Sequence, residues 1–96
     1  IQSRSVVLSD EEQDNLAEVI NICYNNFTDR LWKKFPTLTK VDISLCCLIK
    51  IGISNSNMLY LLDTSKVALK KRKNRLKHDK MGMDENDSLD EFIMEF

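Results

Sequence analysis

The sequence has few residues that break or redirect a chain, with two glycines and one proline among 96 residues. Such scarcity argues against a β-rich protein, which needs many tight turns, and favours a chain built of helices. No apolar run approaches the roughly 18 residues that a membrane-spanning helix requires, and no signal peptide is visible. A chain of this length can bury one core but not two. These absences predict one small all-α unit.

Cysteine and histidine are also scarce, and their positions argue against metal chemistry. The three cysteines, Cys23, Cys46 and Cys47, lie in apolar helical patterns, and we expect them to be buried free thiols in a reducing compartment. The one histidine, His78, lies in a basic stretch, and no Cys-x-x-Cys is present, so neither a metal site nor a cofactor is expected. Because no serine or cysteine is placed to act as a nucleophile, we expect no enzyme and no small-molecule substrate.

What the sequence has in excess is positive charge in one short stretch. Eight of the fourteen Lys and Arg residues lie between Lys66 and Lys80, opposed only by Asp79, so that this stretch carries +7. The remaining residues sum to −8, which gives the formal net charge of −1. A polyanion would therefore meet concentrated positive charge rather than the near-neutral average.

Helix signals divide the chain into about five helices, of which the first is long. Ser9 to Glu12 has the pattern of a capping box, and apolar residues then recur every three or four positions. This apolar stripe consists of Leu16, Val19, Ile20, Cys23, Phe27, Leu31 and Phe35. It predicts one helix of about 26 residues, ended by Pro36 and preceded by a short lead-in over residues 1–8.

Four shorter helices follow, and the second of the five is expected at the centre of the core because it is apolar nearly all round. Gly52 is expected to end that helix in the left-handed conformation. The expected N-caps of the four helices are Thr39, Ser54 or Asn55, Thr64 or Ser65, and Ser88 in a further capping box. Residues 1–37 are thus expected to form a lead-in and a long support helix. Residues 38–96 would form a helix-turn-helix unit, and the two parts would pack as one domain.

The basic fourth helix has the composition of a helix that reads DNA. Its apolar stripe is narrow, with Leu69 and Leu76 seven residues apart, and no acid before Asp79 relieves the repulsion between its cations. The residues expected to reach base edges from the first two turns are Lys70, Lys71 and Asn74. The residues expected at phosphates are Ser65, Lys66, Arg72, Lys73, Arg75, Lys77 and His78.

Composition leaves other interpretations of this helix open, namely a solvated surface helix, a membrane-surface helix or a ligand for an acidic protein groove. A rival from another class is a protein-interaction or dimerisation module that uses the long first helix, with Tyr24, Phe27 and Trp32 as its main contacts. The two classes differ in their response to salt. Binding through about six to eight phosphates weakens by orders of magnitude between about 50 and 200 mM salt, whereas an apolar contact barely changes.

Between Leu38 and Met83 the chain carries a series of short motifs in a fixed order. They are Leu38-Thr39, Asp42, the apolar run Leu45–Ile49, Gly52-Ile53-Ser54-Asn55, Leu61-Leu62, Ser65, Ala68-Leu69-Lys70, Leu76 and Lys80-Met81-Gly82-Met83. In this order they resemble the LuxR/GerE-type helix-turn-helix effector domain of bacterial regulators, over about half of the chain. The stretch from Leu76 to Lys80 is one residue longer than the usual spacing of that family.

The resemblance implies the C-terminal effector domain of a large bacterial sensor-regulator, which binds double-stranded DNA sequence-specifically. Its recognition helix would be the basic fourth helix, with base contacts again at Lys70, Lys71 and Asn74. Homodimerisation on DNA through the last helix would involve Leu89, Phe92, Ile93 and Phe96. Because the chain does not begin with Met, we expect it to be a piece of a larger protein or a processed product. The resemblance implies upstream sensory domains in the same polypeptide. The expected location is cytoplasmic, either free or tethered by an upstream membrane segment.

Overall fold

The structure is a computed structural model that describes residues 7–96. Within this range it contains six α-helices and one π-helical turn, and no strand. The elements are α1 (Asp10–Cys23), α2 (Phe27–Lys34), α3 (Lys40–Lys50), α4 (Asn55–Leu61), α5 (Lys66–Arg75), the π-helical turn η2 (Leu76–Lys80) and α6 (Leu89–Glu95). The expected all-α class is confirmed, with one helix more than expected. The first six residues of the expected lead-in lie outside the described residues.

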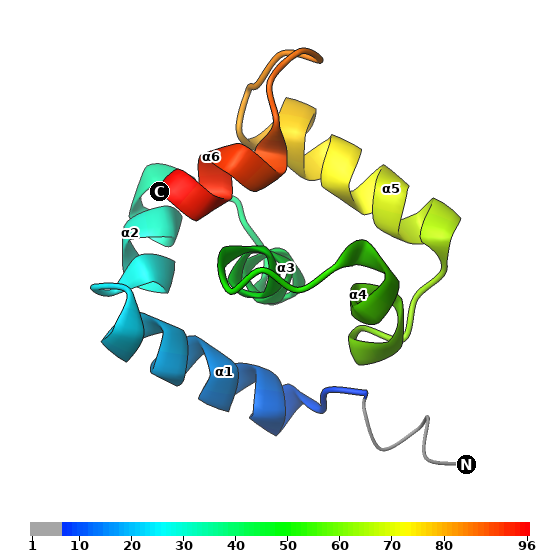
Figure 1. Ribbon diagram of the computed structural model, residues 1–96. Helices are drawn as coiled ribbons and strands as arrows, with labels where there is room; N and C mark the ends of the chain where they lie inside the picture. Colours follow the sequence, from blue (N-terminus) through cyan, green and yellow to red (C-terminus); the bar gives the residue numbers. More distant parts are fainter. Residues whose placement is uncertain (1–6) are drawn as a thin grey trace.

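Helix α3 lies at the centre of the fold, and the other helices surround it (Figure 1). All eight residues from Asp42 to Ile49 are buried. A helix that is apolar on every side is stable only when neighbours cover every side, which explains this central place. The expected caps of α3 are confirmed, because the Thr39 hydroxyl accepts a hydrogen bond from the Asp42 backbone N–H, and Gly52 has a φ of 82°. Ser88 caps α6 as expected, but without the return bond from Glu91 that a capping box requires.

The expectation of one long first helix is wrong, because the chain turns between α1 and α2. Asn25 and Asn26 have φ values of 56° and 58°, in the left-handed region that asparagine tolerates better than most residues. The Asn21 side chain accepts hydrogen bonds from the backbone N and the hydroxyl of Thr28, at 2.7 and 2.9 Å. It thereby satisfies the start of α2, since Asn26 makes no side-chain cap.

This turn divides the predicted apolar stripe between core and solvent. Phe27 and Leu31 on α2 are buried, whereas Val19 on α1 is 54% exposed. Ile22, on the same side of α1 as Val19, is 83% exposed. Two helices of 14 and 8 residues can wrap around α3, which one straight helix of about 26 residues cannot do.

The basic helix α5 continues into the π-helical turn η2, which ends at Lys80. In this turn the Met81 N–H donates a hydrogen bond of 3.0 Å to the Leu76 oxygen, five residues earlier, instead of the four that separate bonded residues in an α-helix. The Lys80 ammonium forms a hydrogen-bonded ion pair with Asp42, which lies in the first turn of α3. The side chain of Asp42 is only 6% exposed. Burial would raise the pKa of Asp42, but hydrogen bonds from Lys80 and Thr39 outweigh burial and hold that pKa below its ordinary value. The end of the basic region is thereby tied to the central helix.

We expect Asp42→Asn to lower the free energy of unfolding by about 2 kcal/mol at neutral pH, because the amide keeps the cap acceptor but loses the charge that pairs with Lys80. Since the pKa of Asp42 is lower in the folded than in the unfolded chain, this contribution is present above a pH of about 4 and is lost as the pH falls through the folded pKa. Urea unfolding of both proteins at a series of pH values measures the difference, which should shrink in acid.

Asp14→Asn is the matched control, because the ion pair between Asp14 and Lys40 is exposed, with side chains 66% and 48% accessible. It should change stability little. Equal losses in the two variants, or a difference that grows as the pH falls, would contradict a stabilising role for the Asp42 pair.

The cysteines provide a second test of the fold, because the expectation of three buried thiols is wrong for Cys23, which is exposed at the end of α1. Cys46 and Cys47 are buried in α3. Burial raises the pKa of the Cys47 thiol to about 12 and raises the pKa of Cys46 as well. We therefore expect one thiol per chain to react with a disulfide reagent under native conditions, and Cys23→Ser to abolish this reaction. Fast reaction of all three thiols in the folded protein would contradict the burial of α3.

Candidate nucleic-acid interface

Two leucines determine which side of α5 faces outward. Leu69 is 4% exposed and Leu76 is fully buried, and their spacing of seven residues places them on one side of the helix. Lys70, Lys71 and Asn74, which are the residues expected at base edges, are all exposed. Helix α5 lies at the outside of the molecule, next to α4 (Figure 1). These three side chains are therefore accessible to solvent.

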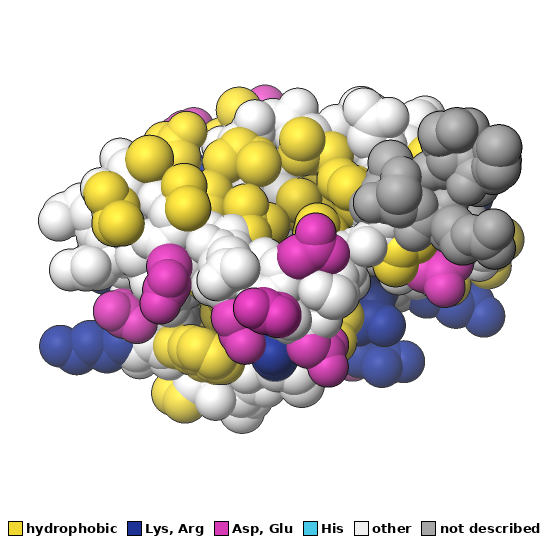
Figure 2. All heavy atoms as spheres, turned by 90° about the horizontal axis from the view of Figure 1, so that it is seen from below, with side chains coloured by type: hydrophobic (Ala, Val, Ile, Leu, Met, Phe, Trp, Pro, Cys, Tyr) yellow, Lys and Arg dark blue, Asp and Glu magenta, His cyan; other side chains and the backbone are white. Residues whose placement is uncertain are grey.

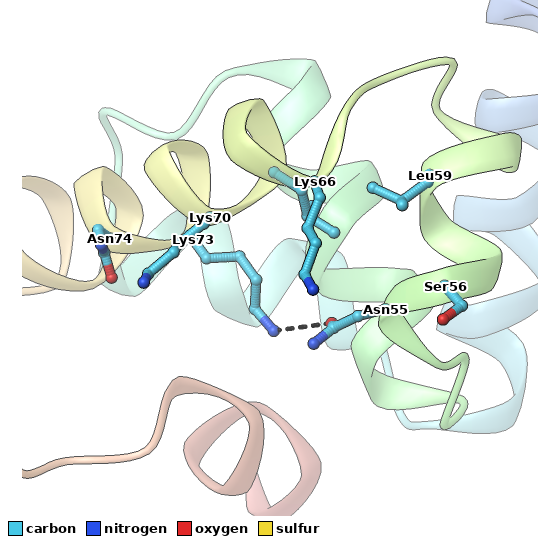
Figure 3. A pocket seen from close by; sticks show the side chains of 8 residues that line it. Asn55, Ser56, Leu59, Lys66, Lys70, Lys73 and Asn74 are labelled. Atoms are coloured by element: carbon cyan, nitrogen blue, oxygen red, sulfur yellow. Dashed lines mark hydrogen bonds between the residues drawn. The ribbon is translucent and has the colours of Figure 1, made fainter.

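A groove of about 400 Å³ lies between α4 and α5 (Figure 3). It is lined by Asn55, Ser56, Leu59, Lys66, Leu69, Lys70, Lys73 and Asn74. Three lysines and two asparagines contribute to the lining, which contains no acidic side chain. Asn55 and Ser56 come from the first turn of α4, and the sequence predicted a role in binding for neither of them. The signal that could have indicated them is their position at the start of the helix that directly precedes the basic helix α5.

Lys73, which the sequence places at a phosphate, is engaged inside the chain. Its Nζ lies 2.8 Å from Asp90 Oδ1 on α6 and 3.2 Å from Asn55 Oδ1 on α4, as the dashed line in Figure 3 shows for Asn55. The Asp90 oxygen is inaccessible to solvent, and within residues 7–96 the Lys73 ammonium is its only polar partner. Lys73 therefore links α4, α5 and α6, and its side chain is only 17% exposed.

Two more of the expected phosphate contacts bind the loop after η2. The Lys77 ammonium donates a hydrogen bond of 2.8 Å to the backbone oxygen of Glu85. Nδ1 of His78 lies 3.0 Å from the backbone oxygen of Met83. Both side chains are half-buried. The second half of the basic stretch thus holds the loop that leads into α6.

Five cations of the basic stretch are exposed or half-exposed and make no ion pair or hydrogen bond through their side chains within residues 7–96. They are Lys66, Lys70, Lys71, Arg72 and Arg75. Ser65 is the N-cap of α5, and its hydroxyl accepts a hydrogen bond of 3.1 Å from the Ala68 N–H. All five cations lie on the ten residues of α5, which is about 15 Å long. The structure thus gathers five unpaired charges over a length comparable to the width of a DNA major groove, which is about 12 Å.

The apolar side chains of helix α6 pack mainly against the core of the same chain. The four residues that the resemblance assigns to dimerisation all pack on the core: Leu89, Phe92, Ile93 and Phe96. The ring of Phe96 lies edge-on to Phe27, with centroids 5.9 Å apart, and Phe92 lies similarly against Phe35 at 6.1 Å. These contacts join α6 to α2 and to the residue that follows it, and Figure 1 shows the two helices side by side. Met94, which is 54% exposed, is the most accessible large apolar residue of α6.

The aromatic residues that were expected on a protein-interaction surface are only partly accessible. Phe27 is fully buried, so its assignment to that surface is wrong, whereas Tyr24 and Trp32 are 38% and 41% exposed. Figure 2, seen from the side of α1, shows hydrophobic side chains gathered on this face with acidic side chains beside them. The exposed Val19 and Ile22 belong to α1. An apolar face and a cationic face thus lie on different helices.

Other kinds of site find little support among the described residues. In residues 7–96, no three His, Cys, Asp or Glu side chains come together in a way that could hold a metal ion. None of the helices in this range has the length and the apolar character that crossing a bilayer would demand.

Because Lys73 links three helices, its removal should lower stability, whereas removal of an exposed cation should not. We expect Lys73→Met to lower the free energy of unfolding by about 1 kcal/mol, because it removes the partner of Asp90. The control is Lys71→Met, which should change stability by less than about 0.5 kcal/mol because Lys71 is exposed and makes no ion pair within residues 7–96. Urea unfolding measures both values. Equal effects of the two substitutions would show that Lys73 does not link the helices.

Comparison with known proteins gives no match to any protein-family model, and no curated protein or solved structure matches the chain significantly. Support for a function therefore comes from the geometry of α4 and α5 and from the sequence motifs. Those two helices, the groove between them and the five unpaired cations form the candidate nucleic-acid interface.

Proposed function

We propose that this chain binds double-stranded DNA sequence-specifically, as a LuxR/GerE-type effector domain at the C-terminal end of a bacterial transcriptional regulator. The observation that supports this best is the outward cationic face of α5. That helix is held to the core by Leu69 and Leu76 on one side and carries five unpaired cations on the others. A DNA major groove admits an α-helix, and phosphates line both of its edges.

Base recognition would come from exposed polar side chains on the outer face of α5. A lysine ammonium, as on Lys70 and Lys71, donates to O6 and N7 of guanine, and the Asn74 amide is suited to N6 and N7 of adenine. Each such contact is worth roughly 1–3 kcal/mol of discrimination against the wrong base. The arginines Arg72 and Arg75 would neutralise phosphates at the edges of the groove.

The groove between α4 and α5 would receive a phosphate of the DNA backbone. Lys66 supplies an ammonium group there, and Asn55 and Ser56 supply an amide and a hydroxyl, all of which donate hydrogen bonds to phosphate oxygens. In helix-turn-helix proteins the first helix crosses the backbone while the second enters the groove, which matches the order of α4 and α5. Lys73 would act indirectly, since Asp90 already holds its charge.

Two copies of the chain would bind a DNA site together, with activity set by upstream sensory domains of the same polypeptide, in the cytoplasm or tethered to the membrane. Because Leu89 and Ile93 are buried in the core of each copy, contact through α6 would use its outer side, where Met94 is exposed. The proposal includes no cofactor, no small-molecule substrate and no enzymatic reaction.

We expect binding of a random-sequence duplex to weaken roughly 500-fold between about 50 and 200 mM salt, because neutralising about five phosphates gives a slope near −4.5 in log affinity against log salt. Fluorescence anisotropy measures this slope directly. On a random-sequence duplex specific base contacts are not available, so Lys70 and Lys71 contribute through their charge. Lys70→Ala/Lys71→Ala should therefore weaken binding strongly and reduce the slope by about 2.

The matched control is Lys33→Ala/Lys34→Ala, which removes two exposed lysines from α2 and leaves α5 intact. Because these lysines lie on a different helix, affinity should change little at the higher salt concentration. No binding at low salt, or equal losses in the two double variants, would refute DNA binding through α5.

A protein-interaction module remains the second candidate, and the exposure of Val19 and Ile22 on α1 favours it. Such a surface would work beside the DNA-binding face rather than replace it, since the two lie on different helices. Val19→Ser/Ile22→Ser should leave DNA affinity unchanged under the first proposal. Loss of self-association in the same variant, measured by sedimentation, would assign α1 to a protein contact.

A further inference from the structure

Among the exposed residues of α5 there is one large apolar side chain. Val67, the second residue of the helix, is 65% exposed and packs neither in the core nor against it. The other apolar residues of comparable size on α5 and η2, Leu69 and Leu76, are buried. Valine is also a weak helix former, because its branched side chain loses rotamer freedom. Nothing in the fold of residues 7–96 thus requires a valine at this position.

The position of Val67 on the helix is informative. Lys70, Lys71 and Asn74 follow it by three, four and seven residues, which places all four side chains on one face. Leu69 lies on the opposite side and holds the helix to the core. Val67 is therefore the N-terminal member of the row that faces away from the protein. In a helix-turn-helix unit the N-terminal residues of the second helix are the ones that contact base edges.

The chemistry of valine narrows what it could recognise. Its side chain neither donates nor accepts a hydrogen bond, so it cannot distinguish purines by their polar edges. The major groove offers one apolar feature, which is the C5-methyl group of thymine. A methyl contact on this face would complement the guanine and adenine contacts available to Lys70, Lys71 and Asn74, because it reads a base that they do not.

We propose that Val67 is a specificity-determining residue that reads the C5-methyl group of a thymine in the major groove, an inference that rests on the proposed DNA binding. One thymine of the target site would pack against the two γ-methyl groups of Val67. Burial of one methyl group corresponds to about fourfold in affinity. The contact would lie at the edge of the recognised sequence that faces the N-terminal end of α5.

The test is a cycle of four affinities, measured by anisotropy on a duplex obtained by site selection with the complete chain. Each thymine of the duplex is replaced in turn by deoxyuridine, which removes only the methyl group and keeps every hydrogen bond. The protein is compared with Val67→Ala, which shortens the same contact from the other side. At one position deoxyuridine should weaken binding of the wild type by about fourfold and should leave binding of Val67→Ala nearly unchanged.

Three controls keep the cycle interpretable. Val67→Thr conserves the branched shape and one of the two methyl groups, so it should retain most of the sensitivity to the thymine methyl. Thermal unfolding of Val67→Ala should match that of the wild type, since the side chain lies outside the core. At the responsive position the thymine–adenine pair is also replaced by a cytosine–guanine pair, with and without a methyl group on C5 of the cytosine. The duplex with 5-methylcytosine should bind the wild type more tightly than the duplex with cytosine, because it recovers part of the methyl contact.

The outcomes separate the two proposals. If the wild type binds no duplex, the proposed DNA binding itself fails. If it binds and selects a site, but no thymine responds to loss of its methyl group, Val67 does not read a thymine. An identical response in Val67→Ala would exclude this role for Val67 as well. Coupling at one position, together with unchanged stability, would establish Val67 as a specificity residue.

Discussion

Burial of α3 on all sides determines where the other helices of this chain can lie. Eight consecutive buried residues, Asp42 to Ile49, require a neighbour on every face. Helices α1, α2 and α6 all pack on α3, and the turn at Asn25 and Asn26 lets the first two helices follow its surface. The Asp42–Lys80 pair then fixes the end of the basic region at the N-terminal end of α3. With these places occupied, α4 and α5 lie side by side at the outside of the molecule.

The narrow apolar stripe of α5 has two consequences that act together. Two leucines are enough to anchor the helix, so most of its circumference remains available for polar side chains. Like charges without intervening acids repel one another, and contacts inside the chain offset this repulsion at only some of the cations. Asp90 holds Lys73, and the backbone of Glu85 holds Lys77. The cations left unpaired are concentrated on α5 itself, which is where a partner with a high density of negative charge would bind.

Local signals in the sequence predicted much of the fold, because caps and turn residues act over three or four positions. Thr39 caps the N-terminus of α3 through its hydroxyl, and Gly52 follows the end of that helix in the left-handed conformation, as predicted. The turn at Asn25 could not be read from apolar periodicity, since the buried residues on either side of it keep a helical spacing. The roles of Lys73 and Lys77 were equally hidden, because their partners come from another helix or a loop and become neighbours only after folding. Exposure of Lys70, Lys71 and Asn74 agrees with their place opposite the two leucines, whereas their contact with bases remains a prediction.

The proposed function requires that a polyanionic partner binds the outer face of α5 and the first turn of α4. The most direct measurement is a titration of the isotopically labelled chain with a DNA duplex at low salt, followed by amide chemical shifts. We expect the largest shifts at residues 55–56 and 65–75, while the amides of α1 and α2 change little. Shifts confined to α1, or no shifts at all, would contradict DNA binding through α5 and would favour the exposed apolar face around Ile22 as the working surface.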